Sequence, residues 1–186
     1  MNKRSFVASA VALPAVLAAG IWTGMSAAQQ GAESATTTGF TARLNAAQEI
    51  PKPKGVRAGA QGTFTAGLVR SGSGGKLSWR LSFQGLTGKA TASHIHVGVR
   101  GRAGAVRVAL CGPCRSGASG SANVNATTIT ALLAGKTYVN VHTARNAAGE
   151  IRGQITKTAT PPVLPPPPTT TATTGSTTVV TDDYYP

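Results

Sequence analysis

The segment Lys76–Phe83 alternates strictly between polar and apolar residues, and this period of two constrains the fold more than any other feature. Side chains two residues apart in an extended strand lie on the same face of a sheet. The apolar members therefore share one face and the polar members share the other, a pattern typical of a half-buried antiparallel strand. The members that we expect to point into a core are Leu77, Trp79, Leu81 and Phe83.

Several other short segments have a similar pattern and are separated by glycine-rich turns such as Arg70–Gly75 and Gly98–Gly104. One helix is predicted over Thr127–Ala134, just before Gly135. The pattern favours an all-β fold, an antiparallel Greek-key-type β-sandwich of about seven to eight strands with one short helix. The remaining expected strands are Phe40–Leu44, Gly62–Leu68, Thr91–Val97, Ala105–Leu110, Ser121–Asn125, Thr137–Thr143 and Glu150–Thr156.

Both ends of the chain differ in composition from this middle part. Residues 1–28 combine a basic start, an apolar run and the small residues Ser26-Ala-Ala28, which predicts a secretory signal peptide; an uncleaved membrane anchor is the alternative. Residues 29–38 are expected to be a disordered segment. One domain is predicted over residues 39–157, followed by a Pro/Thr-rich disordered tail over 158–186. We expect no transmembrane segment in the mature chain and a secreted or cell-envelope location.

All three histidines of the chain lie in two of the predicted strands. His94 and His96 are two residues apart and share a face of the first strand, and His142 shares a face of the second strand with Asn140. If the two strands pair or face each other, the three imidazoles converge.

Three imidazoles can bind copper or zinc and leave one coordination position open. The sequence therefore predicts a metal site of His94, His96 and His142, with copper as the favoured ion and no cofactor certain. The alternative is that the histidines bond to neighbouring polar residues and fix the sheet edge. Asn140, Glu150 and Arg152 are the predicted supporting polar residues, the last two as a local ion pair or network beside the histidine strand.

The two cysteines, Cys111 and Cys114, form a Cys-Gly-Pro-Cys segment that is similar to the redox motif of thioredoxins. A redox role needs a helix N-terminus to lower the thiol pKa. Here the motif follows a strand-like run and precedes a Gly/Ser-rich stretch that is a poor helix. In an exported chain, a local structural disulfide that closes a turn is the better interpretation.

The net charge of +13 predicts anionic partners. Sixteen of the 18 basic residues lie between Arg43 and Lys157, where Glu49 and Glu150 are the only acidic residues. Anionic polymers of the cell envelope or the extracellular space fit this excess. Specific nucleic-acid binding is not favoured, because the basic residues are scattered and aromatic residues for base stacking are few.

Three segments together resemble the CHRD (chordin-type) domain. They are Leu44–Pro51, Ala92–Gly98, and Tyr138–Thr143 followed by Gly149–Ile155, in the order expected for that family. The resemblance covers about residues 39–156. It implies an extracellular, β-rich module for which the family has no established catalytic activity.

A weaker resemblance links His94-Ile-His96 and Val141-His142 to the copper-ligand strands of Cu/Zn superoxide dismutases. The bridging and zinc-binding histidines of those enzymes have no counterpart here, and residues 39–157 contain no Asp. The sequence thus leads to two hypotheses: a non-catalytic extracellular binding or structural module, and a copper- or zinc-binding protein, with superoxide dismutation as an extension of the second.

Overall fold

The computed structural model describes residues 36–161 and 163. The predicted signal segment 1–28 lies outside these residues, as do most of the segment 29–38 and most of the tail 158–186. The first strand begins at Thr37, two residues before the predicted start of the domain. Within the described part of the chain, no helix has the length and apolar character needed to cross a membrane.

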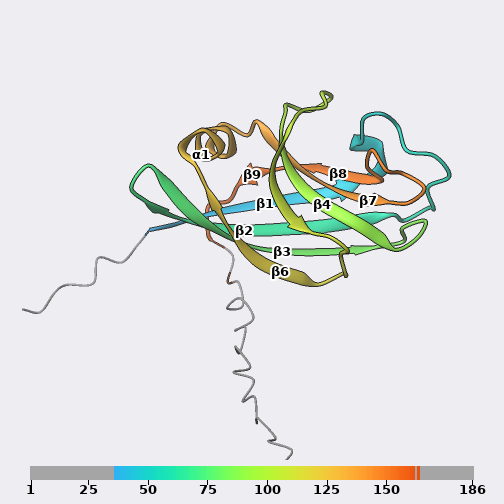
Figure 1. Ribbon diagram of the computed structural model, residues 1–186, viewed down its shortest axis with the longest axis horizontal. Coiled ribbons are helices and arrows are strands. Elements are labelled where there is room, and N and C mark those ends of the chain that lie inside the picture. The colour runs from blue at the N-terminus through green and yellow to red at the C-terminus, as the bar shows by residue number, and fades with distance from the viewer. Residues whose placement is uncertain (1–35, 162, 164–186) are drawn as a thin grey trace, which may run out of the picture. The chain divides into compact units, whose positions relative to one another are not determined.

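The strands form one antiparallel sheet with the order β5-β4-β7-β8-β1-β2-β3-β6, and β9 pairs with β1 (Figure 1). The end strands β5 and β6 contact each other, so the sheet nearly closes on itself. The strands are β1 (Thr37–Asn45), β2 (Gln61–Ser71), β3 (Gly74–Gln84), β4 (Ala90–Val97), β5 (Val106–Cys111), β6 (Ala118–Val124), β7 (Thr137–Thr143), β8 (Ile151–Gln154) and β9 (Thr156–Lys157).

The prediction of an all-β antiparallel fold with one short helix is confirmed. The strands belong to a single curled sheet whose two halves enclose the core, rather than to two separate sheets. The helix α1 (Ala126–Leu133) begins one residue earlier than predicted, because the Asn125 side chain accepts a hydrogen bond from the Thr128 amide at 2.9 Å and caps it.

The core forms where the inward rows of the two halves meet. Leu77, Trp79 and Leu81 of β3 are buried as the alternation predicted, and they pack in one cluster with Val139 and Val141 of β7. The residues between these positions face outward. This alternation decides on which face of the sheet each polar side chain of the strands lies, including those of the histidines.

The predicted strand Glu150–Thr156 is divided in two. β8 lies between β7 and β1 and pairs with both, whereas β9 pairs with β1; Ile155 between them is fully buried, and its amide donates to the Thr137 carbonyl. A short 3₁₀ helix, η1 (Ala46–Gln48), and the long loop that follows it were not predicted.

Cys111 at the end of β5 and Cys114 form a disulfide, which confirms the predicted local bridge. The bridge closes the turn that leads from β5 toward β6, the two strands at the ends of the sheet. The Cys114 amide also donates to the Ala90 carbonyl at the start of β4. The segment is therefore part of the scaffold beside the seam where the sheet nearly closes.

We expect Gly104→Ala to destabilise the fold by at least about 2 kcal/mol. Gly104 ends the loop after β4, and a Cβ placed there would lie 1.6 Å from the Val97 carbonyl oxygen, so the backbone would have to move. Urea unfolding measures the loss. Gly88→Ala is the matched control, because a Cβ at Gly88 meets nothing within 4 Å. Equal unfolding midpoints for the two variants would contradict the expectation.

Candidate metal centre

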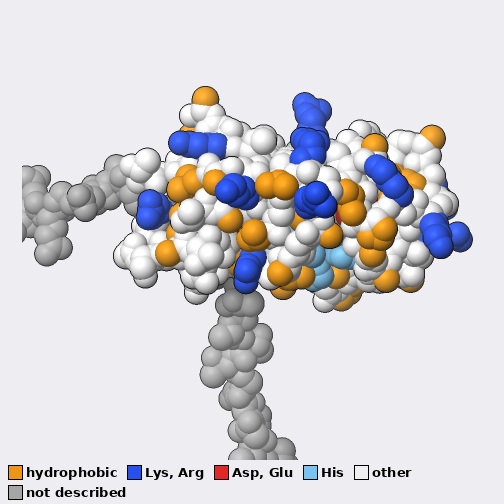
Figure 2. All heavy atoms as spheres, turned by 90° about the horizontal axis from the view of Figure 1, so that it is seen from above, with side chains coloured by type: hydrophobic (Ala, Val, Ile, Leu, Met, Phe, Trp, Pro, Cys, Tyr) orange, Lys and Arg blue, Asp and Glu red, His pale blue; other side chains and the backbone are white. Residues whose placement is uncertain are grey.

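The pairing of β4 with β7 brings the three histidines to one place on the outer face of the sheet. In the register of this pair, His94 lies opposite Asn140, His96 opposite Tyr138, and Ala92 opposite His142. His142 is therefore the diagonal neighbour of His94, and all three rings project away from the core. In the space-filling view the histidines form one patch on the surface (Figure 2).

The potential ligand atoms of His94, His96 and His142 all lie within 4.8 Å of one another. His94 Nδ1 is 3.2 Å from His142 Nε2. Nitrogen ligands about 2.0–2.1 Å from a tetrahedral ion are separated by roughly 3.3 Å, so this pair already has the spacing that a metal requires. His96 is buried and 8% exposed, and it completes the cluster if the separations that involve it, at most 4.8 Å, shorten by up to about 1.5 Å.

Backbone carbonyls fix the orientation of two of the rings. His96 Nδ1 lies 2.9 Å from the Gly104 carbonyl oxygen, and His142 Nδ1 lies 2.9 Å from the Ala147 carbonyl oxygen. We assign the proton to Nδ1 in both rings because a carbonyl oxygen only accepts. The Nε2 lone pairs then remain available, and that of His96 is buried without a hydrogen-bond partner. Metal-bound histidines are commonly oriented through their second nitrogen in this way.

Two of the rings, His94 and His142, favour the neutral form. Partial burial lowers the pKa of His94, and the neighbouring His142 and His96 lower it further. Burial also lowers the pKa of His142, an effect opposed in part by the hydrogen bond to Ala147 and assisted by His96. Neutral rings are the form that binds metal, so protons compete weakly with a cation at neutral pH.

His96 is held by a stack that extends to β8. Its ring is parallel to the Tyr138 ring at 4.7 Å between centroids, and the Arg152 guanidinium carbon lies 3.4 Å from the centre of the same Tyr138 ring. Two residues of this stack also bond to the loop between β4 and β5. The Tyr138 hydroxyl accepts a hydrogen bond from the Gly104 amide, and Arg152 Nη2 donates to the carbonyl oxygens of Val99 and Arg102. Arg152 is therefore a fully buried support of the site.

Glu49 is a second buried charged residue beside the cluster, on the loop after η1. It is 1% exposed, and its Oε1 accepts from the Ile50 amide. Burial raises the pKa of Glu49, although the Ile50 amide, the charge of Arg152 and the Asn140 amide each lower it. Asn140 in turn places its Oδ1 3.0 Å from His142 Nε2. Two oxygens, those of Ala147 and Asn140, thus face the two nitrogens of His142, and a neutral ring can donate to only one of them.

Glu150 and Arg152 form no ion pair with each other; of the two predicted arrangements, the structure has the network, in which Glu150 contacts Thr143 of β7 and Arg152 lies over the Tyr138 ring of β7. The Glu150 carboxylate accepts hydrogen bonds from the hydroxyls of Thr87 and Thr143, the Thr87 amide and the Asn146 side chain. Burial would raise the pKa of Glu150, but these bonds outweigh it and lower the pKa. The physical reason is position: Glu150 precedes β8 and lies in the turn, whereas Arg152 is inside the strand.

Glu150 supports the cluster indirectly, through the Asn146 side chain. The Asn146 side chain that it binds also bonds to the backbone of Lys54, at 2.8 Å to the amide and 3.2 Å to the carbonyl. These contacts fix the turn after β7, which supplies the Ala147 carbonyl to His142. The sequence reasoning missed Glu49, Tyr138 and Asn146. The sequence did offer one signal for Glu49. Glu49 and Glu150 are the only acidic residues in a segment that contains 16 basic residues, and the structure buries both of them.

The model of the CHRD domain family matches residues 40–155, which is more than half of the chain. The chain belongs to the CHRD family. No curated protein and no solved structure gives a significant match. The resemblance inferred from the three sequence segments is thus confirmed, and the domain is of an extracellular type. The similarity to superoxide dismutases stays a prediction.

Acidification should destabilise the metal-free CHRD domain through the histidine cluster. The pKa values of His94 and His142 are lowered from 6.5 in the folded state, so the unfolded chain binds more protons below about pH 6.5. Their contribution to stability is complete above that pH and is lost as the pH falls toward the lowered values.

Urea unfolding between pH 8 and pH 5, in the presence of a chelator, measures this contribution. The double variant H94N/H142N should lose less stability than the wild type over this interval. Other titrating groups are present in both proteins and cancel in the difference. Parallel stability profiles for the two proteins would show that the cluster does not disfavour protonation.

Proposed function

We propose that this CHRD domain is an extracytoplasmic metal-binding module in which His94, His96 and His142 hold one copper ion. The observation that carries the proposal is the geometry of the cluster: three ligand atoms within 4.8 Å of one another, two of them with the opposite ring nitrogen bonded to a backbone carbonyl. The histidine ligands come from two adjacent strands of a nearly closed sheet, a rigid support for a binding site.

Copper is favoured over zinc on chemical grounds. A site of imidazole nitrogens suits both ions, but divalent copper forms the stronger complexes with nitrogen ligands. No carboxylate belongs to the cluster, and with three ligands one coordination position stays open. We assign binding to the site and no reaction, because the sequence lacks the additional histidines that the superoxide dismutase resemblance would require.

Calorimetric titration of the untagged chain with Cu(II), Cu(I) and Zn(II), against a competing chelator, tests the proposal. We expect one copper ion per chain and weaker binding of zinc. His96→Ala should reduce copper affinity by at least about 100-fold, because it removes one of three ligands and leaves the other two without a third. Asn140→Ala is the matched control on the same face, and it should keep the one-to-one stoichiometry.

Copper content that is unchanged in the triple variant H94A/H96A/H142A would remove the proposal, since the chain contains no other histidine. Circular dichroism of each variant shows that the fold is retained. If the wild type binds no metal above background, the histidines are scaffold only.

Export is the second part of the proposal. It is supported by the basic and apolar pattern of residues 1–28, by the extracellular type of the domain and by the Cys111–Cys114 disulfide. N-terminal sequencing of the protein recovered from outside the cytoplasm should give a chain that begins at about Gln29. Recovery of the intact chain from the cytoplasm, with free thiols at Cys111 and Cys114, would contradict export.

A further inference from the structure

A second candidate site lies on the other half of the sheet. The outward positions of β1, β2, β3 and β6 form one continuous surface, here called the polar face. These positions carry Ser, Thr, Asn, Gln, Gly, Arg or Lys, with Val69 as the one apolar exception. The polar face is separate from the histidine cluster, which lies on β4 and β7.

Among residues 36–161, no acidic side chain reaches the polar face. Glu49 and Glu150 are the only acidic residues between positions 36 and 161, and they are 1% and 0% exposed. Three exposed basic residues, Arg43, Lys76 and Arg80, stand among the uncharged ones. A negatively charged ligand would therefore meet attraction and no repulsion on this surface.

The basic residues are spread along the face rather than gathered at one point. Arg80 is two strands across the sheet and two residues along it from Arg43, a separation of about 12 Å. Lys76 is four residues from Arg80 on the same strand, a separation of about 13 Å. A small anion can contact only one of them. A polymer with charges repeated along its length can contact all three.

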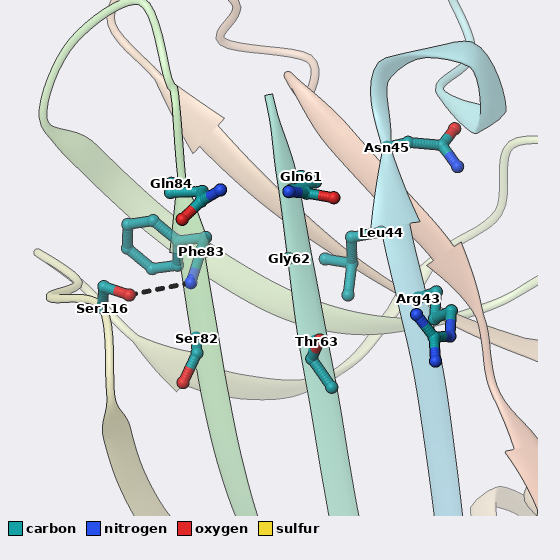
Figure 3. Close-up of a pocket in the computed structure, with 10 residues that line it drawn as sticks. All are labelled: Arg43, Leu44, Asn45, Gln61, Gly62, Thr63, Ser82, Phe83, Gln84 and Ser116. Carbon is teal, nitrogen blue, oxygen red and sulfur yellow. Dashed lines mark hydrogen bonds between the residues drawn. The ribbon is translucent and has the colours of Figure 1, made fainter. Parts of the chain in front are cut away.

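A hollow of about 420 Å³ lies at one end of the polar face, where the side chains form two rows across three strands (Figure 3). The amides of Asn45, Gln61 and Gln84 make the first row, and Arg43, Thr63 and Ser82 make the second. Amide and hydroxyl groups both donate and accept hydrogen bonds, as do the hydroxyls of a sugar ring. The hollow thus offers paired donors and acceptors beside a cation.

Two other classes of polyanion fit this face less well. The large apolar side chains that are exposed in the described residues, Val99, Val106, Leu133 and Val163, all lie elsewhere, so the polar face has nothing to insert into a lipid surface. The one aromatic residue that lines the hollow, Phe83, belongs to the inward row of β3 and is half-buried, so the face offers no fully exposed ring on which a nucleic-acid base could stack.

We propose that the polar face binds an anionic polysaccharide. The hollow at Asn45, Gln61 and Gln84 takes one sugar unit through its hydroxyls, and Arg43, Arg80 and Lys76 contact carboxylate or sulfate groups along the polymer. The proposal does not depend on metal binding, because the two sites share no residue.

Binding of the full chain to polygalacturonate and to dextran sulfate tests the proposal and separates the two anionic groups. Uncharged dextran, polyglutamate, anionic phosphatidylglycerol vesicles and duplex DNA are the comparison ligands. We expect the triple variant R43Q/K76Q/R80Q to bind at least one of the two polysaccharides about tenfold more weakly than the wild type, since three exposed charge contacts each contribute a small factor. The charge-matched control R102Q/K136Q/R145Q, in loops outside the polar face, should change the affinity less than twofold.

A second variant tests the recognition of the sugar. Q61A/Q84A keeps every charge and should weaken polysaccharide binding at least threefold while leaving polyglutamate binding unchanged. Four results would overturn the proposal: equal losses in the two charge variants, polyglutamate bound as tightly as the polysaccharides, a preference for vesicles or DNA, or no polysaccharide binding at low salt. The same assays on H94A/H96A/H142A should match the wild type, so failure of this site is distinguishable from failure of the metal site.

Discussion

The register between β4 and β7 is the constraint on which the candidate metal centre depends. It sets His94 opposite Asn140 and His96 opposite Tyr138, and it directs Ile95, Val139 and Val141 into the core. Because side chains alternate across a strand, a slip of one residue would bury the imidazoles and expose the aliphatic residues. The burial of the aliphatic row therefore fixes the position of the histidine cluster, and the free energy that stabilises the core also maintains the geometry of the site.

One buried acid and one buried arginine organise the loops around this register. Glu150 holds the turn after β7 through Thr87, Thr143 and Asn146, while Arg152 holds the loop after β4 through two carbonyl oxygens. Those two loops supply the carbonyls that orient His142 and His96. Removing the acids from the surface has a further consequence, since it leaves an exposed domain surface on which basic residues have no acidic neighbours. The burial of the acidic residues thus has two effects: it fixes a turn beside the histidine cluster, and it leaves the polar face without negative charge.

The strands and the histidine cluster could be predicted from the sequence because both follow from a period of two. The alternation in Lys76–Phe83 and the pair His94 and His96 need only local geometry. The division of the last strand at Ile155, the curling of one sheet in place of two and the loop that brings Glu49 to the cluster depend on contacts between distant segments. Spacing alone left open whether Glu150 and Arg152 form an ion pair or a wider network; the structure has no direct pair, because Glu150 precedes the strand and its side chain is bound by the turn.

The most direct test of the account is the position of copper in crystals of the loaded protein, located by anomalous scattering at the copper edge. The account predicts one strong peak per chain, within bonding distance of His94 Nδ1, His96 Nε2 and His142 Nε2, with the carbonyls of Gly104 and Ala147 still bonded to the opposite ring nitrogens. A peak bound to other residues, or copper-soaked crystals with no peak at the cluster, would contradict it.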